Sequence, residues 1–139
     1  MAVRNFSASQ TVATFNIAPI TDWGSSDPAF TLALVEDAVT MTQGNGGNAV
    51  AFGRKNPIYE LVVNLSPGGP NSSLVWSAFQ NELTVTFTYE IIQTLEKFIG
   101  TEGRVINIGT TGRAGPTISD DTYTIQFNNV TMFKGGNAI

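Results

Sequence analysis

The sequence predicts a mostly β fold, an antiparallel β-sandwich or barrel with one short α-helix at about residues 71–81. Apolar and polar residues alternate with a period of two in several segments, which is typical of strands buried on one face. Turn-forming residues separate these segments about every 8–12 residues, as in all-β domains. No internal repeat or linker divides the chain, so residues 1–139 are expected to form a single domain.

The region from about residue 29 to residue 66 contains four expected strands. Turn signals separate them at Glu36-Asp37, at Gly44-Asn45-Gly46-Gly47 and at Lys55-Asn56-Pro57. The glycine-rich turn can supply the positive φ angles that a hairpin needs. We therefore expect a meander with strands at residues 30–35, 39–42, 48–52 and 58–65.

A helical period follows the Ser-Pro-Gly-Gly-Pro sequence of residues 66–70. The apolar face of the expected helix consists of Leu74, Val75, Ala78 and Phe79. Asn71 or Ser72 can cap its N-terminus, because their side-chain oxygens can accept hydrogen bonds from unpaired N–H groups of the first turn. This helix is expected to cover one face or end of the sheets.

The C-terminal half predicts three more strands. Alternation is unbroken from Leu83 to Ile91, and residues 90–99 fit either a helix that stops at Gly100 or an extension of this strand. We favour the strand. Another strand is expected at Arg104–Ile108, followed by a loop over residues 109–121.

The last expected strand begins at Tyr123, and its apolar phase changes after Phe127. Tyr123, Ile125 and Phe127 occupy odd positions, whereas Val130 and Met132 occupy even ones. A shift of one residue within a strand indicates a bulge, which is predicted at Asn128-Asn129.

The composition is unusual in its low charge. Charged residues make up 13% of the chain, about half the share of an average soluble domain. The polarity comes instead from 17 Thr, 12 Asn, 9 Ser and 5 Gln, which form a surface that packs easily against another copy. The net charge of −4 and the lack of a basic run disfavour stable binding to nucleic acid. These features favour a structural or binding protein over an enzyme.

Several kinds of chemical site are excluded or disfavoured. The chain has no His and no Cys, so imidazole catalysis, thiolate nucleophiles and the usual zinc sites are absent. Asp22, Asp27 and Asp120-Asp121 lack the spacing of a calcium loop and are better explained as turn formers. Residues 44–49 match G-x-G-x-x-A, but they lie between two expected strands and not before a helix. We expect no catalytic residue, no metal and no cofactor.

The two tryptophans are the remaining candidates for binding. Trp76 lies beside the apolar face of the expected helix, which favours burial in the core or in an interface. Trp23 lies in a loop between Asp22 and Gly24, where an exposed aromatic side chain has more functional weight. It could stack on a sugar or, as we favour, pack between subunits.

Three stretches of the chain carry a family resemblance. Residues 34–47 contain an acidic pair, a Thr-Met-Thr strand and a glycine-rich turn; residues 61–74 contain a strand, a Ser-Pro pair and an Asn-led helix; and residues 123–127 precede a Gly-Gly pair. In these features the chain resembles tail-tube structural proteins of contractile-tailed bacteriophages. The resemblance covers mainly residues 30–80.

The resemblance implies a β-subunit that forms hexameric rings, which stack into a hollow tube for the passage of DNA without specific binding. The implied partners are further copies of the chain and the tail sheath, baseplate and tail terminator proteins, with no membrane and no catalysis. The implied location is the virion, after the host cytoplasm. The alternatives are another virion β-protein (tail terminator, baseplate or decoration) and a non-viral glycan-binding module.

An assembly interface is expected at the hairpin of residues 43–57. The candidate residues are Gln43, Asn45, Phe52, Arg54, Lys55 and Asn56, together with Trp23. The alternative is an ordinary surface hairpin. If the hairpin serves assembly, deletion of residues 44–56 is expected to leave soluble subunits that no longer polymerise.

Overall fold

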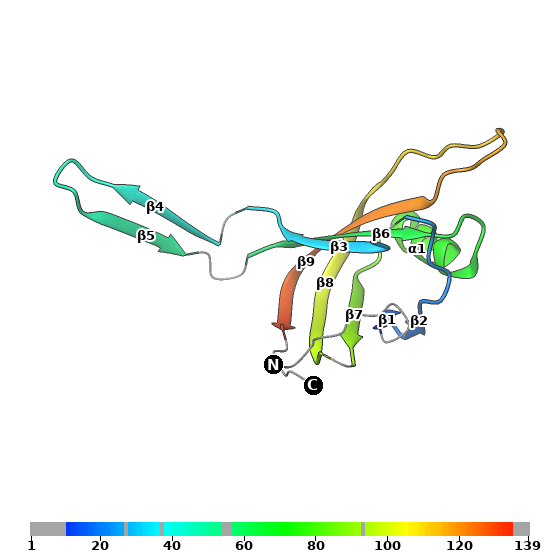
Figure 1. Ribbon diagram of the computed structural model, residues 1–139, viewed down its shortest axis with the longest axis horizontal. Coiled ribbons are helices and arrows are strands. Elements are labelled where there is room, and N and C mark those ends of the chain that lie inside the picture. Colours follow the sequence, from blue (N-terminus) through cyan, green and yellow to red (C-terminus); the bar gives the residue numbers. More distant parts are fainter. Residues whose placement is uncertain (1–10, 27, 37, 54–56, 93, 135–139) are drawn as a thin grey trace, which may run out of the picture.

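The computed structural model describes residues 11–26, 28–36, 38–53, 57–92 and 94–134. The elements are β1 (Thr11–Phe15), β2 (Ala18–Pro19), β3 (Phe30–Leu34), β4 (Val39–Gln43), β5 (Ala49–Gly53), β6 (Tyr59–Leu65), α1 (Pro70–Gln80), β7 (Val85–Ile91), β8 (Glu96–Ile108) and β9 (Asp121–Phe133). Seven strands form one antiparallel sheet in the order β2-β1-β7-β8-β9-β6-β3, and β4 and β5 form a separate ribbon (Figure 1). The fold is therefore mostly antiparallel β with a short helix, as the sequence predicts.

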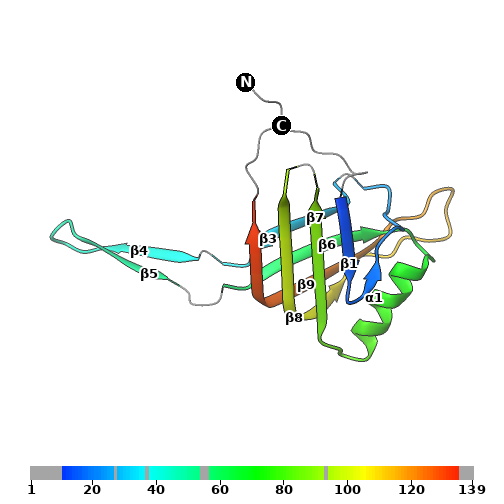
Figure 2. The same ribbon diagram turned by 90° about the horizontal axis from the view of Figure 1, so that it is seen from below.

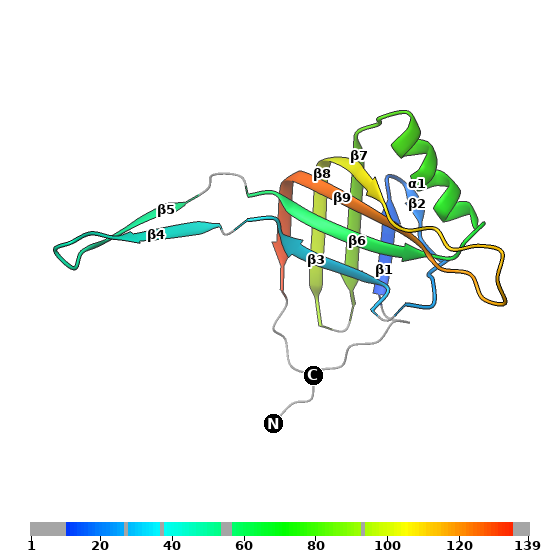
Figure 3. The same cartoon turned by 90° about the horizontal axis from the view of Figure 1, so that it is seen from above.

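The large sheet curls so that strands far apart in its order face each other. In Figures 2 and 3, β1, β7 and β8 run across the direction of β3 and β6. The ring of Phe30 on β3 lies 6.1 Å from that of Phe87 and 5.0 Å from that of Tyr89, both on β7. The core between the two layers is closely packed, and its fully buried aromatic side chains are Phe15, Phe87, Phe98 and Phe127.

The expected four-stranded meander is wrong. β3 pairs with β6, and β4 pairs with β5 in a separate ribbon that lies between β3 and β6 in the sequence. The pairing of Phe30 with Val63 and of Leu32 with Leu61 places the apolar residues of both strands on the core side. Alternation identifies these strands correctly, but it does not specify which strand pairs with which.

The helix is confirmed, but its predicted cap is wrong. α1 begins at Pro70 after Gly69, and no side chain caps its N-terminus. The amide of Asn71 is buried and used elsewhere: its oxygen accepts from the backbone N–H groups of Thr21 and Asp22 at 3.0 and 3.1 Å, and its nitrogen donates to the carbonyl of Pro19 at 3.1 Å. Asn71 therefore ties the helix to the chain that follows β2.

Residues 90–99 contain a turn between two strands and not a helix. β7 ends at Ile91 and β8 begins at Glu96, so that Tyr89 pairs with Phe98 across the hairpin. Leu95 has a φ of 59°, a left-handed conformation that reverses the chain. The preferred strand conformation is confirmed at the two ends of the segment, in β7 and in β8, but the turn between these strands was not predicted.

The predicted bulge at Asn128-Asn129 is wrong, although the change of phase is real. β8 and β9 keep a regular register there, with Thr101 opposite Asn129 and Gly103 opposite Phe127. Instead, the register of β8 shifts against β7 between the pairs Val85–Gly103 and Phe87–Gly100. β8 and β9 both change which face of the strand is buried here, because the two paired strands bend together at this point.

Two glycines on β8 let Phe127 lie against the backbone at this bend. A Cβ atom added at Gly100 would lie 2.8 Å from the Phe127 ring, and one added at Gly103 would lie 2.5 Å from it. Real Cβ atoms do not approach other atoms so closely, so any larger residue would push the ring away. The separate strand that was expected at Arg104–Ile108 is the last part of β8, beyond this bend.

Candidate assembly surfaces

The β4–β5 ribbon, Val39–Gly53, projects from the body of the molecule, and we call it the arm (Figure 1). All five residues of each of its strands are exposed. Among them are large apolar side chains: Met41 is 67% exposed and Phe52 is 62% exposed. The arm contains no charged residue at any of its positions. An exposed, uncharged, apolar ribbon is typical of a surface that another molecule covers.

The tip of the arm is a narrow glycine-rich turn. The backbone N–H of Gly44 donates to the carbonyl of Asn48 at 2.8 Å, and that of Gly47 donates to the carbonyl of Gly44 at 3.1 Å. Gly47 has a φ of +83°, which a residue with a side chain adopts only with strain. The sequence correctly predicts this hairpin and the positive φ at its turn.

The predicted assembly residues are divided between the arm and other parts of the chain. Gln43 ends β4, Asn45 lies in the turn, and Phe52 lies on β5. Arg54, Lys55 and Asn56 lie outside the described residues. The remaining candidate, Trp23, lies in the body and is not part of the arm.

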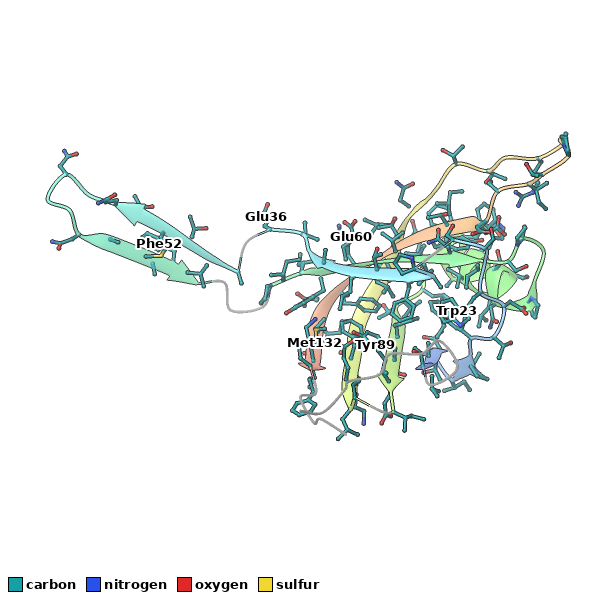
Figure 4. All side chains as sticks on the ribbon, in the orientation of Figure 1. Trp23, Glu36, Phe52, Glu60, Tyr89 and Met132 are labelled. Carbon is teal, nitrogen blue, oxygen red and sulfur yellow. The ribbon has the colours of Figure 1, made fainter. Side chains whose placement is uncertain are left out.

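Trp23 lines a groove at the open mouth of the curled sheet. Its ring stacks on that of Phe30 at 5.4 Å, so Phe30 covers one face of the indole. The groove has a volume of about 690 Å³, and its apolar wall includes Trp23, Phe30, Leu32, Tyr89, Ile91 and Met132. Figure 4 shows Trp23, Tyr89 and Met132 in a row beneath β3, far from Phe52 on the arm. Sequence reasoning singled out Trp23 but did not predict the groove, since its wall combines segments that lie far apart in the sequence.

Among the residues that the structure describes, the charged groups that line the groove are Glu96 and Lys134. The hydroxyl of Tyr89 donates to the Glu96 carboxylate at 3.1 Å. Burial, together with the nearby Glu96 carboxylate, raises the pKa of Tyr89 well above its usual value of 10.0. Tyr89 is therefore a neutral donor at ordinary pH, and the aromatic wall of the groove carries no charge of its own.

The acidic residues considered for a metal site have structural partners. The carboxylate of Asp120 accepts hydrogen bonds from the backbone N–H groups of Ser25 and Ser26, at 3.0 and 2.9 Å, and from their hydroxyls. These bonds, led by that from the Ser25 backbone, lower the pKa of Asp120. Asp121 pairs with Arg113 at 2.7 Å and accepts a hydrogen bond from Ser72.

Asp22 differs from Asp120 and Asp121, because one of its carboxylate oxygens is buried without a hydrogen-bond partner in the described chain. Asp27 lies outside the described residues. Over the part of the chain that the structure describes, no three His, Cys, Asp or Glu residues form a group that could hold a metal ion. Nor does any helix there have the length and apolar character needed to cross a membrane.

No protein-family model matches the sequence, and neither does any curated protein. Several solved structures are similar to this chain in fold. A chain of the sheath-tube complex of an extracellular contractile injection system (PVC), in its extended state, aligns with a TM-score of 0.59 at 12% identity, over 94% of this chain and 92% of that chain. A chain of the anti-feeding prophage baseplate aligns with a TM-score of 0.58 at 12% identity, over 96% and 98%.

The sheath/tube terminator of the PVC system, also in its extended state, aligns with a TM-score of 0.57 at 11% identity, over 93% of this chain and 96% of that chain. At such low identity these likenesses concern the fold. The chain shares its fold with chains of the sheath-tube complex and terminator of an extracellular contractile injection system and with a chain of the anti-feeding prophage baseplate.

Proposed function

We propose that this protein is a structural subunit of the tube of a contractile phage tail or a related injection system, and that it has no enzymatic activity. The observation that carries the proposal is the arm, an uncharged ribbon whose large apolar side chains are more than half exposed. Its occurrence on a tail-tube-like fold supports assembly with further copies of the same chain.

The proposed assembly is a hexameric ring that stacks on other rings to form a hollow tube. An arm on one subunit and its receptor on another make a heterologous contact, which generates rings when the rotation closes and filaments when it does not. Burial of apolar surface drives such contacts at about 25 cal/mol per Å². The sparse charge of the chain fits a subunit whose surface is largely covered by its neighbours.

The proposed partners beyond the chain itself are sheath, baseplate and terminator proteins, and the cargo that passes through the lumen is DNA. A net charge of −4 suits a channel that repels DNA and does not grip it. In a salt titration the assembled tubes are expected to show no retention of duplex DNA. Tight binding that weakens steeply with salt would contradict this part of the proposal.

A tail terminator, cap or baseplate component is the alternative function, because chains of those assemblies share the fold to the same degree. The two roles differ in the product of assembly. A tube subunit adds rings without limit, whereas a terminator stops at one or a few rings.

Electron microscopy of the purified protein at high concentration tests the proposal. The wild-type chain is compared with a variant in which the whole arm, Val39–Gly53, is replaced by a short Gly-Ser linker. Deletion of residues 44–56 alone would leave β4 unpaired, so removal of both strands is the cleaner design. We expect long hollow tubes from the wild type and single chains from the variant. Isolated rings would favour the terminator, and tubes from the variant would exclude a role of the arm in polymerisation.

A further inference from the structure

We infer that the groove is the receptor for the arm of a second copy, and that Phe52 is the side chain that enters it. This inference rests on the proposed function, since it names the partner surface of the arm. It concerns two separate features of the chain, the projecting arm with its apolar side chains and the groove with its apolar wall. Among the described residues, the large apolar side chains of the arm are more than half exposed, and the groove is open to solvent.

The cross-strand register divides the arm into two different faces. Met41 pairs with Ala51, and Thr40 pairs with Phe52, and residues directly opposite each other share a face. The Met41 face contains Ala49, Ala51 and Gly53 along β5 and is therefore shallow. The other face bears Phe52, which stands out as the only ring on the arm. A protruding ring requires a hollow with an apolar wall.

The groove meets this requirement. Its wall presents the partly exposed rings of Trp23 and Phe30, with the largely buried ring of Tyr89 packed beside Phe30, and such rings favour edge-to-face and offset contacts with another aromatic side chain. The carboxylate of Glu96 already accepts a hydrogen bond from Tyr89. An uncharged occupant leaves that bond in place and brings no charge into the groove. These properties favour the arm over a charged peptide or a nucleic acid.

The edge of β3 beside the groove can also bind an arm strand through the main chain. The carbonyl of Ala29 accepts from the N–H of Asn64 at 2.9 Å, and the N–H of Val35 donates to the carbonyl of Ile58 at 3.0 Å. Since main-chain groups alternate in direction along a strand, those of Phe30, Leu32 and Leu34 point away from β6. A strand added at this edge would direct alternate side chains toward the groove, as Phe30 and Leu32 do.

The arm of the same chain does not fill its own groove. Figures 1, 2 and 3 all show the arm extending outward from the body, beyond the end of the β3–β6 pair. The receptor is therefore on another copy, and each copy offers one arm and one groove. Such head-to-tail contacts can continue from copy to copy.

Cysteine cross-linking tests this contact directly, because the natural chain contains no Cys. The test protein is full-length, keeps Phe52 and carries Thr40→Cys and Met132→Cys, which place one thiol beside Phe52 on the same face of the arm and one in the groove. The matched control carries Thr40→Cys and Ile106→Cys; Ile106 is exposed on β8 and lies outside the groove. Both proteins are treated with a short bis-maleimide reagent at high concentration.

We expect a ladder of covalent oligomers from the first protein, and mainly dimers, through two Thr40→Cys thiols, from the control. Equal ladders from both proteins, or no ladder from the first, would overturn the inference. A second groove position, Leu32→Cys on β3, guards against a folding defect at Met132, and thermal unfolding confirms that each variant is folded. If all folded groove variants fail to cross-link, the inference is wrong.

Microscopy of the wild type separates this inference from the proposed function. Tubes without arm-to-groove cross-links would leave the tube function intact and place the arm elsewhere on the neighbour. Cross-linked ladders without tubes would support the contact and contradict the tube function.

Discussion

The body and the arm are built from the same kind of strand but differ in what covers them. Phe127 on β9 is 0% exposed and packs against Phe98, with ring centroids 5.8 Å apart. Phe52 on β5 has the same side chain and is 62% exposed. The arm therefore exposes an apolar ring of the kind that the body buries, and in the proposed assembly a neighbouring subunit would cover it.

The contrast also separates stability from assembly. A two-stranded hairpin alone is only marginally stable in water, whereas seven strands around an apolar core are expected to fold cooperatively. Changes in the body should therefore alter the free energy of unfolding. Changes in the arm should leave it almost unchanged and alter the size of the assemblies.

The largest expected effect comes from a matched pair of phenylalanine truncations. Phe127→Ala removes a fully buried ring and is expected to lower the free energy of unfolding by about 3–5 kcal/mol. Phe52→Ala is expected to change it by less than about 0.5 kcal/mol, because the ring is exposed in the subunit. Denaturant unfolding at low concentration measures both, and equal losses would contradict the division between body and arm.

A pair of glycine substitutions sharpens the same comparison. A Cβ added at Gly103 meets the Phe127 ring at 2.5 Å, so Gly103→Ala is expected to cost about 1–3 kcal/mol through overpacking. No atom lies within 4 Å of a Cβ added at Gly46 in the turn of the arm. Gly46→Ala should therefore leave the midpoint of thermal unfolding nearly unchanged. A destabilising Gly46→Ala would indicate that the arm packs on the body.

A smaller effect is expected from the hydrogen bonds beneath the helix. The hydroxyl of Tyr123 lies 3.0 Å from that of Ser72 and donates to the Ser72 carbonyl at 3.2 Å. Tyr123→Phe should lower the free energy of unfolding by about 1 kcal/mol. Thr42→Val, on the exposed arm, is the control and should have no measurable effect on unfolding. An unchanged stability of Tyr123→Phe would show that these bonds contribute nothing net.

The smallest effect concerns pH. The pKa of Tyr89 is raised in the folded protein, so above pH 10 the unfolded chain loses this proton before the folded chain does. The contribution of Tyr89 to stability is constant below pH 10 and decreases as the pH rises above it. Tyr89→Phe should therefore reduce the alkaline loss of stability. A wild type and variant with parallel curves from pH 9 to 11 would contradict the burial of this hydroxyl.

The sequence predicts most strands because their alternation reflects a local contact with one buried face. β3, β6 and the long run that contains β7 are found in this way, whereas β4 and β5 are predicted from the turn signals that flank them. The predicted meander was wrong because strand pairing depends on contacts between distant segments: β3 pairs with β6 and not with β4, the next strand in the sequence. The cap was wrong because Asn71 bonds to the chain around Pro19 and Thr21, which sequence spacing does not bring near the helix.

The arm was accessible to sequence reasoning, whereas the groove was not. The glycine-rich turn and the uncharged flanking strands are both local features, and they identified Gln43, Asn45 and Phe52 as candidates for assembly, which remains a prediction. The groove exists only because the sheet curls until Phe30 meets Tyr89. Trp23 was noted for its loop position, but the rings around it could be assigned only from the tertiary structure.

Sedimentation velocity of the wild type and of Phe52→Asp, over a range of concentrations, tests the central claim most directly. A carboxylate at position 52 would have to be buried in the proposed contact, so it should prevent assembly without disturbing the folded body. We expect the wild type to shift to large, concentration-dependent species, and the variant to remain at the size of a single chain. Equal sedimentation of the two proteins at every concentration would contradict assembly through the arm.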